Sequence, residues 1–272
     1  MKILVLGSTG QIGTSLVFSL MEESKYEIFG FARKLNNFDV WQKVTDADVI
    51  INCVGVGDPA KVAEIGPEIL NLTGLIDRQI MDYLIKYPNV KYINFSSGVV
   101  NLPLNLETPN YYQMAKIYSE VRHRSMKGYL IVDLRLYGFF SQFIDLNSKF
   151  FLAALVKAAK NKEVFKTDFN QLFRDYIGPK DLSRLINICI YSGRLNRAFD
   201  VYSFKPANKF EILEYFKNKY NLKVDFVDEF DSPRTANSDY YFSSNRDLLG
   251  FGYTPKMTAM QTIIEEASAI LE

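Results

Sequence analysis

Residues 2–13, KILVLGSTGQIG, decide the expected fold of this chain. The apolar, β-branched run Lys2–Leu6 predicts a buried strand, and apolar residues then recur at helical spacing from Ile12 onward. A strand, a glycine-rich turn and a helix in this order form the context in which a dinucleotide fingerprint binds pyrophosphate. The stretch therefore predicts a nucleotide cofactor site. The alternative is an ordinary turn that needs its glycines for geometry alone.

The residues of this turn have separate expected roles. Gly7 permits the tight turn, Gly10 lets the backbone approach a pyrophosphate, and Gly13 allows close packing of helix on strand. The helix N-terminus supplies N–H donors and a positive dipole end for the anion. The residues expected to contact the cofactor here are Gly7, Ser8, Thr9, Gly10, Gln11, Ile12 and Gly13.

A second motif lies in residues 110–116, NYYQMAK. Tyr112 and Lys116 are four residues apart and would share a helix face. An ammonium beside a phenol favours the phenolate, so such a tyrosine can act as an acid or base near neutral pH. Tyr111 competes for this role, but its spacing from Lys116 is wrong for a shared face. The alternative is a tyrosine and a lysine on a solvated helix face.

A third motif, YINFSSG at residues 92–98, predicts a strand that ends in two hydroxyls, Ser96 and Ser97. Open parallel sheets bind ligands at the carboxyl ends of their strands. A hydroxyl there can donate a hydrogen bond to a substrate oxygen. The alternative is a serine pair that caps a loop.

In this order, the three motifs resemble the extended short-chain dehydrogenase/reductase family, which includes the sugar-nucleotide epimerases, dehydratases and reductases. The resemblance extends over essentially the whole chain. It implies an α/β fold: a Rossmann doubly wound parallel sheet with a small interleaved C-terminal substrate lobe. Further matching segments are Asp48–Gly55, Asn71–Gly74, Arg174–Ile177 with Asp181, and Asn245–Phe251 with Pro255.

The hydrophobic pattern also alternates between strands and helices, which indicates a mostly parallel sheet covered on both faces. The resemblance places an NAD(P)-binding core in residues 1–137, completed near 179–204, and a mainly substrate-binding lobe in 138–272. The expected strands lie near residues 2–7, 26–32, 48–54, 90–96, 128–136 and 198–203. The expected helices lie near residues 11–22, 67–87, 111–127, 149–161, 179–192 and 257–271.

Composition excludes several classes of function. Lys and Arg number 32 against 31 Asp and Glu, so no charge excess favours a nucleic-acid or membrane partner. The two cysteines, Cys53 and Cys189, have no metal-ligand spacing and lie in apolar runs typical of buried thiols. No signal peptide or membrane span is apparent. We therefore expect a cytoplasmic protein without a metal site.

The end of the second expected strand bears on the choice of cofactor. Arg33 and Lys34 stand where NAD-binding proteins usually have a carboxylate, and a guanidinium can bind a 2′-phosphate through two N–H groups. NADP(H) is therefore favoured over NAD(H). The resemblance places Asp39 near the adenine. It also places Cys53, Val54 and Gly55 at the floor of the adenosine site.

The resemblance assigns the catalytic roles to Ser97, Tyr112 and Lys116. Tyr112 would donate a proton to a carbonyl oxygen as hydride arrives, Lys116 would also bind the nicotinamide ribose, and Ser97 would stabilise the developing charge. The backbone near Tyr137 would lie beside the nicotinamide. Two further residues are expected at the substrate: Ser96 as a second hydroxyl, and Arg174 at its diphosphate.

The favoured activity is NADP-dependent reduction of a keto-sugar nucleotide, of the 4-ketoreductase type. An NAD-dependent sugar-nucleotide 4-epimerase and a non-catalytic NAD(P)-binding sensor or scaffold are the alternatives. Gly98 and Val99 follow Ser97 and cannot move a proton, which argues against a 4,6-dehydratase.

Two further expectations concern the predicted helices. His123, the sole histidine, is expected to be solvated rather than catalytic, which argues against a 3,5-epimerising reductase. Family members form dimers through the helices that correspond to residues 67–87 and 111–127, so a homodimer is expected.

Overall fold

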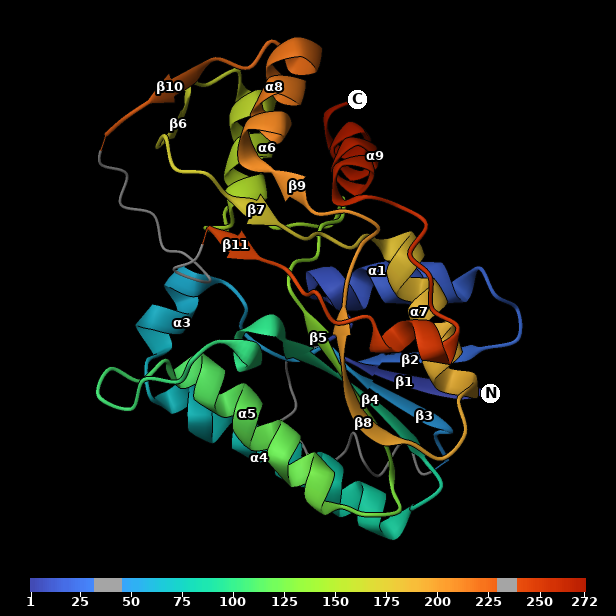
Figure 1. Ribbon diagram of the computed structural model, residues 1–272. Helices are drawn as coiled ribbons and strands as arrows, with labels where there is room; N and C mark the ends of the chain where they lie inside the picture. Colours follow the sequence, from blue (N-terminus) through green and yellow to red (C-terminus); the bar gives the residue numbers. More distant parts are fainter. Residues whose placement is uncertain (32–45, 229–238) are drawn as a thin grey trace.

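The computed structural model describes residues 1–31, 46–228 and 239–272. At its centre is a six-stranded sheet in the order β2-β1-β3-β4-β5-β8, with every neighbouring pair parallel (Figure 1). The order reverses beside β1, which is where doubly wound sheets bind dinucleotides. The expected fold class is confirmed. The strands of this sheet are β1 (Lys2–Leu6), β2 (Glu27–Phe31), β3 (Val49–Asn52), β4 (Lys91–Ser97), β5 (Leu130–Leu136) and β8 (Asn196–Val201).

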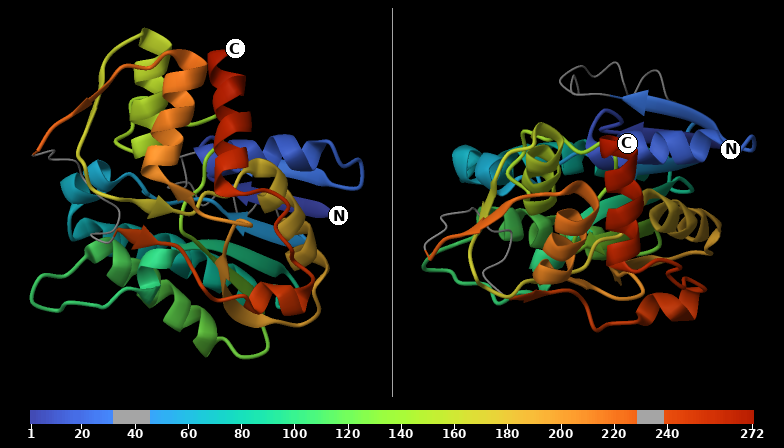
Figure 2. Two further views of the ribbon diagram at one scale, coloured as in Figure 1. Left: turned by 45° about the horizontal axis from the view of Figure 1, so that its top comes forward. Right: turned by 90° about the horizontal axis from the view of Figure 1, so that it is seen from above.

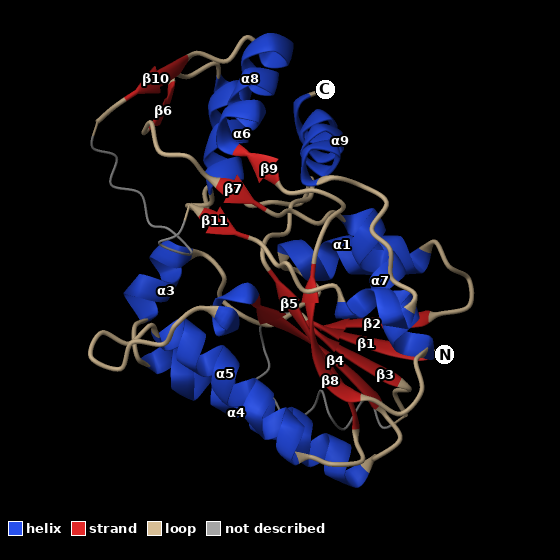
Figure 3. Cartoon of the chain, in the orientation of Figure 1, coloured by secondary structure: helices blue, strands red, loops and turns tan. Residues whose placement is uncertain are grey.

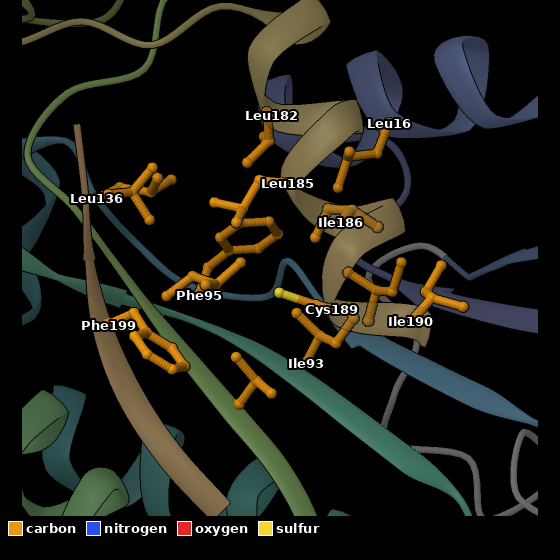
Figure 4. Close-up of a cluster of buried hydrophobic side chains, with 14 of the residues drawn as sticks. Leu16, Ile93, Phe95, Leu136, Leu182, Leu185, Ile186, Cys189, Ile190 and Phe199 are labelled. Carbon is orange, nitrogen blue, oxygen red and sulfur yellow. The ribbon is translucent and has the colours of Figure 1, made fainter. Parts of the chain in front are cut away.

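Helices cover both faces of the sheet. Helices α1 (Gln11–Met21) and α7 (Pro179–Tyr191) lie on one face, and α4 (Glu68–Lys86) and α5 (Tyr111–Ser125) lie side by side on the other (Figure 1). The short helix α3 (Pro59–Ile65) precedes α4. Both layers bury apolar side chains against the sheet. Figure 4 shows the α1/α7 side, where Leu16 and Leu185 pack over Ile93 and Phe199.

Most of the remaining described residues form a C-terminal lobe above the carboxyl ends of the strands (Figure 2). Three helices pack a second apolar core here: α6 (Phe151–Asn161), α8 (Lys209–Tyr220) and α9 (Ala259–Leu271). The lobe is mainly helical, and its strands are short (Figure 3). They form two small sheets, β10-β6 and β11-β7-β9. Their bounds are β6 (Phe165–Thr167), β7 (Phe173–Arg174), β9 (Ala207–Asn208), β10 (Val224–Phe226) and β11 (Tyr240–Tyr241).

The sequence did not predict the short helix α3, and the other helix and strands that it missed lie in the lobe. Helix α8 mixes charged and aromatic residues, so its apolar face is poorly marked, although Asn208 caps it by accepting from Phe210 N at 2.8 Å. Strands of two or three residues are too short to show a period. Within the described part of the chain, no helix combines the length and apolar composition needed to cross a bilayer.

Candidate active site

A cavity of about 280 Å³ lies between the carboxyl ends of the central strands and the C-terminal lobe. It brings together side chains from the glycine turn, the ends of β3, β4 and β5, helix α5 and the lobe. The sequence-predicted residues that line it are Gln11, Ile12, Cys53, Val54, Gly55, Ser96, Ser97, Tyr112, Lys116, Tyr137 and Arg174. Among the other predicted residues, Arg33, Lys34 and Asp39 lie outside the described ranges.

The glycine turn has no room for side chains at two positions. Gly7 has φ +76°, and a Cβ there would lie 2.9 Å from the Cys53 carbonyl. A Cβ at Gly13 would lie 2.2 Å from the oxygen of Gly7. The end of β2 closes the turn, since Gly7 N and Ser8 N both donate to Phe31 O, at 2.8 and 3.1 Å. The backbone of the turn therefore packs directly against β3 and its own helix.

The start of α1 fits the pyrophosphate of a dinucleotide. Its N-cap residue, Gly10, supplies no side-chain hydrogen bond, and the first turn holds no acidic residue. A Cβ at Gly10 would meet only Gly7 O, at 3.4 Å. Within the described residues, the buried Gln11 Nε2 has no hydrogen-bond partner. Unsatisfied donors at a helix N-terminus form a suitable site for a phosphate.

Helix α5 presents Tyr112 and Lys116 to the cavity. Asn110 begins the helix by accepting a hydrogen bond from Gln113 N at 3.0 Å. Lys116 Nζ donates to Phe95 O at 2.9 Å and lies 5.7 Å from the Tyr112 ring centroid. The ammonium is thus fixed between β4 and the phenol.

The two serines at the end of β4 point in different directions, because successive residues of a strand face opposite sides. Ser97 Oγ accepts from Val99 N at 3.4 Å and lies 3.3 Å from the hydroxyl of Tyr241. Ser96 Oγ instead donates to Glu120 Oε1 at 2.6 Å. Ser97 is therefore the serine with a hydroxyl available to a substrate.

The turn after Ser97 is tied to α5. This turn, η1 (Gly98–Asn101), is held by Gln113 Nε2, which donates to Val99 O at 2.9 Å and to Leu102 O at 2.7 Å. Gln113 is itself buried. Because one side chain joins the turn to the helix, Ser97 keeps a fixed position relative to Tyr112.

Tyr137 packs against the same turn. A Cβ at Gly98 would lie 2.6 Å from the Tyr137 ring, so glycine is required for this approach. The Tyr137 hydroxyl accepts from Asn101 Nδ2 at 2.8 Å and donates to Asp200 Oδ2 at 3.0 Å. Burial raises the pKa of Tyr137, so the phenol stays neutral. Tyr137 thus forms part of the rigid wall of the cavity.

Arg174, in β7, brings a positive charge to the lobe side of the cavity. Its NH1 donates to Phe173 O at 3.1 Å and to Asp239 O at 3.2 Å. Its guanidinium carbon lies 5.8 Å from the ring centroid of Tyr241. A planar guanidinium at this position suits contact with a phosphate.

A family model, the NAD dependent epimerase/dehydratase family, matches residues 3–202. The chain belongs to this family. It is accordingly an enzyme of a family that uses an NAD(P) cofactor. A search of curated proteins found no match.

Solved structures of this family's fold are similar at low sequence identity. The UDP-glucose 4-epimerase of Thermotoga maritima, with UDP-glucose, has a TM-score of 0.83 and 16% identity, covering 98% of both chains. The UDP-N-acetylglucosamine 4-epimerase of Methanobrevibacter ruminantium has a TM-score of 0.83 and 18% identity, covering 98% of this chain and 97% of that one. The UDP-glucuronic acid 4-epimerase of Bacillus cereus, with UDP-glucuronic acid and NAD, has a TM-score of 0.80 and 16% identity, covering 99% of both chains.

The family motifs did not indicate two features of the structure. Tyr241 lines the cavity and approaches Ser97, but the pair Tyr240–Tyr241 carries no motif from which a role could be predicted. Lys209 and Asp168 also line the cavity as a buried ion pair, with Nζ 2.7 Å from Oδ1. The first feature joins the lobe to the central sheet and the second joins two parts of the lobe, and both connect residues that are distant in sequence.

The expectation that His123 is solvated was wrong. Its side chain has no exposed surface and lies between two carboxylates, with Nδ1 2.9 Å from Asp133 Oδ1 and Nε2 2.6 Å from Asp77 Oδ1. Burial lowers the pKa of His123, but the two carboxylates outweigh this effect and raise it to about 9. His123 is therefore a buried cation near neutral pH. It joins α4, α5 and β5 and does not line the cavity.

Proposed function

We propose that the protein is an NAD-dependent 4-epimerase of a sugar nucleotide. The observation that carries this proposal is the convergence of Ser97, Tyr112 and Lys116 on a cavity beside the glycine turn Gly7–Gly13. The similar solved structures include several 4-epimerases with nucleotide sugars, two of them also with NAD. This support favours the epimerase over the reductase expected from the sequence.

In the proposed reaction, Tyr112 accepts the proton of the sugar hydroxyl while hydride leaves the carbon that bears this hydroxyl. The nicotinamide cofactor, when bound, supplies the acceptor and donor of that hydride. Lys116 places a positive charge 5.7 Å from the Tyr112 ring centroid, where it stabilises negative charge that develops at the reacting groups. Ser97 donates a hydrogen bond to the same substrate oxygen and steadies it as its charge changes. Tyr112 returns the proton after the keto sugar has presented its other face.

Other predicted residues keep their proposed binding roles, whereas the Ser96 hydroxyl already donates to Glu120. The turn residues Gly7–Gly13 would hold the pyrophosphate, and Cys53–Gly55 would lie beneath the adenosine. Arg174 would bind the substrate diphosphate. We also infer that residues 1–137, completed near 179–204, mainly bind the cofactor, and that residues 138–272 mainly bind the substrate.

A second candidate is the NADP-dependent 4-ketoreductase. One sequence observation favours it: Arg33 and Lys34 follow β2 in the sequence, where NAD-binding proteins usually have a carboxylate, and a guanidinium can bind a 2′-phosphate. A reductase would consume one NADPH for each keto sugar, whereas an epimerase returns the hydride that it removed. The stoichiometry therefore separates the two.

The test uses protein purified without added nucleotide. We would identify any retained cofactor by mass and then supply UDP-glucose, UDP-N-acetylglucosamine and UDP-glucuronic acid. Epimer formation without net change of the nicotinamide supports the proposal, and it should disappear in Tyr112→Phe. Tyr111→Phe is the matched control, since Tyr111 does not line the cavity. Turnover only of keto sugars, with stoichiometric loss of NADPH, would establish the reductase instead.

We further propose that two copies of the chain pair through α4 and α5. Apolar side chains on the outer surface of these adjacent helices are exposed: Leu72 and Leu75 on α4, and Tyr118 and Val121 on α5. The two rows meet where a Cβ at Gly74 would lie 3.9 Å from the Tyr118 ring. A second copy would remove this surface from water.

A further inference from the structure

Tyr241 brings a phenol from the C-terminal lobe into the centre of the candidate active site. It lies on β11, which pairs with β7 so that Tyr241 is opposite Arg174. Its side chain is only 2% exposed and lines the cavity. It packs with Val99 in a cluster that also includes Tyr112 and Tyr137. The lobe therefore supplies part of the wall around the reacting groups.

Either hydroxyl of the Tyr241–Ser97 pair could donate by geometry, since the two oxygens lie 3.3 Å apart. Ser97 Oγ is the one acceptor within 3.5 Å that the structure gives the Tyr241 hydroxyl among the described residues. A phenol is a stronger hydrogen-bond donor and a weaker acceptor than an aliphatic hydroxyl, which favours donation from Tyr241 to Ser97. In this direction the Ser97 proton is left for an oxygen bound in the cavity. Burial also raises the pKa of Tyr241, so the phenol keeps its proton.

This arrangement determines what Ser97 can still do. A serine hydroxyl has two acceptor sites and one proton. Val99 N and Tyr241 both donate to Ser97 Oγ, so both acceptor sites are filled. The remaining capacity of Ser97 is its own proton, and the side chain lines the cavity. Ser97 is thus prepared to donate to an oxygen placed there.

A second set of bonds holds the segment after β11 in place. Ser243 Oγ, two residues beyond Tyr241, donates to Asp200 Oδ2 at 2.7 Å. Asp200 also accepts from Tyr137, at 3.0 Å, and from Asn101 of the turn η1, at 2.9 Å. One buried carboxylate on β8 therefore anchors the turn after Ser97, the wall beside it and the strand that carries Tyr241.

We propose that Tyr241 is a positioning residue that directs the Ser97 hydroxyl proton toward the substrate oxygen. The inference rests on the proposed function, because it assigns Ser97 as a donor in that reaction. It gives the C-terminal lobe a part in the chemical step beyond substrate binding.

The test is a double-mutant cycle on epimerisation of whichever UDP-sugar the wild type converts. Tyr241→Phe keeps the ring and removes the hydroxyl. Loss of one hydrogen bond should lower kcat about five- to tenfold, with KM and NAD affinity within about twofold of wild type. In the Ser97→Ala background the same change should cost less than about twofold, because Ser97 is no longer there to be oriented.

The control variant is Tyr202→Phe. Tyr202 is also a buried phenol, its hydroxyl has no hydrogen-bond partner within the described ranges, and it does not line the cavity. This variant should keep wild-type kcat. Equal losses from Tyr241→Phe with and without Ser97, or a loss confined to KM or NAD affinity, would overturn the inference.

Failure of the inference differs visibly from failure of the proposed function. If Tyr241→Phe has wild-type kcat while Tyr112→Phe has lost activity, the inference is wrong and the epimerase proposal stands. If the wild type converts none of the UDP-sugars, the proposed function is wrong and the inference falls with it.

Discussion

The buried cation at His123 predicts an unusual loss of stability toward alkaline pH. The imidazole of His123 is enclosed by Asp77 of α4 and Asp133 of β5, and these carboxylates also pair with Arg122 and Arg124. Asn94 Nδ2 donates to Asp133 as well, at 2.7 Å. Protonated His123 thus stabilises the packing of both helices on the sheet.

The magnitude follows from the pKa of His123, which is raised from 6.5 to about 9 in the folded state. At about 1.4 kcal/mol per pH unit, protonated His123 contributes about 3 kcal/mol to folding. Because the folded pKa is the higher one, this contribution is complete below pH about 6.5 and is lost as pH rises through about 9. Integrated over pH, this linkage predicts that the free energy of unfolding falls by about 2 kcal/mol between about pH 6 and 8.

The assay is urea unfolding at several pH values in this window, for wild type and His123→Gln. The free energy of unfolding should fall with pH in the wild type and be nearly flat in the variant. Because His123 is the sole histidine, NMR titration of its ring protons measures its pKa without an assignment step, even if the variant folds poorly. A wild-type profile that is flat across this window, or a measured pKa near 6.5, would refute the reasoning.

Three other predictions concern cofactor binding and assembly. Gly13→Ala should abolish NAD binding, since its Cβ would lie 2.2 Å from Gly7 O, whereas Gly193→Ala, where a Cβ meets nothing within 4 Å, should bind normally in calorimetry. Arg33→Ala should weaken NADPH binding at least about tenfold if Arg33 contacts the 2′-phosphate, and equal affinities for NADPH in variant and wild type would remove the argument for the reductase. Val121→Asp should convert a dimer to a monomer in light scattering, because it puts a charge into an apolar contact, and a wild-type monomer would contradict the pairing of α4 and α5.

The sequence predicted the Rossmann core because that part depends on local signals. Its strands are short apolar runs, two of which are followed directly by glycine (Gly7 after β1 and Gly98 after β4), and its helices have apolar residues at helical spacing. Tyr112 and Lys116 are four residues apart on one helix, so their spacing alone predicts that they face the same cavity. The glycine turn could be predicted for the same reason, since its geometry depends on residues that adjoin in the chain.

The parts that could not be predicted depend on contacts between distant residues. His123 lies between two arginines in the sequence, which suggested a solvated position, yet Asp77 and Asp133 enclose it from other elements. Tyr241 reaches Ser97 from 144 residues away in the chain. No periodicity or motif records either pairing. The choice of cofactor depends on residues 33 and 34, which lie outside the described ranges.

The most direct test of the proposed reaction follows the hydride itself. Wild-type protein and Tyr112→Phe would be incubated with a UDP-sugar deuterated at the sugar carbon to be inverted, and the product analysed by NMR. We predict that the wild-type epimer retains the deuterium without net consumption of nicotinamide, and that Tyr112→Phe binds the cofactor but forms no product. Epimer that has lost its deuterium to the medium, or unchanged turnover in Tyr112→Phe, would contradict the account.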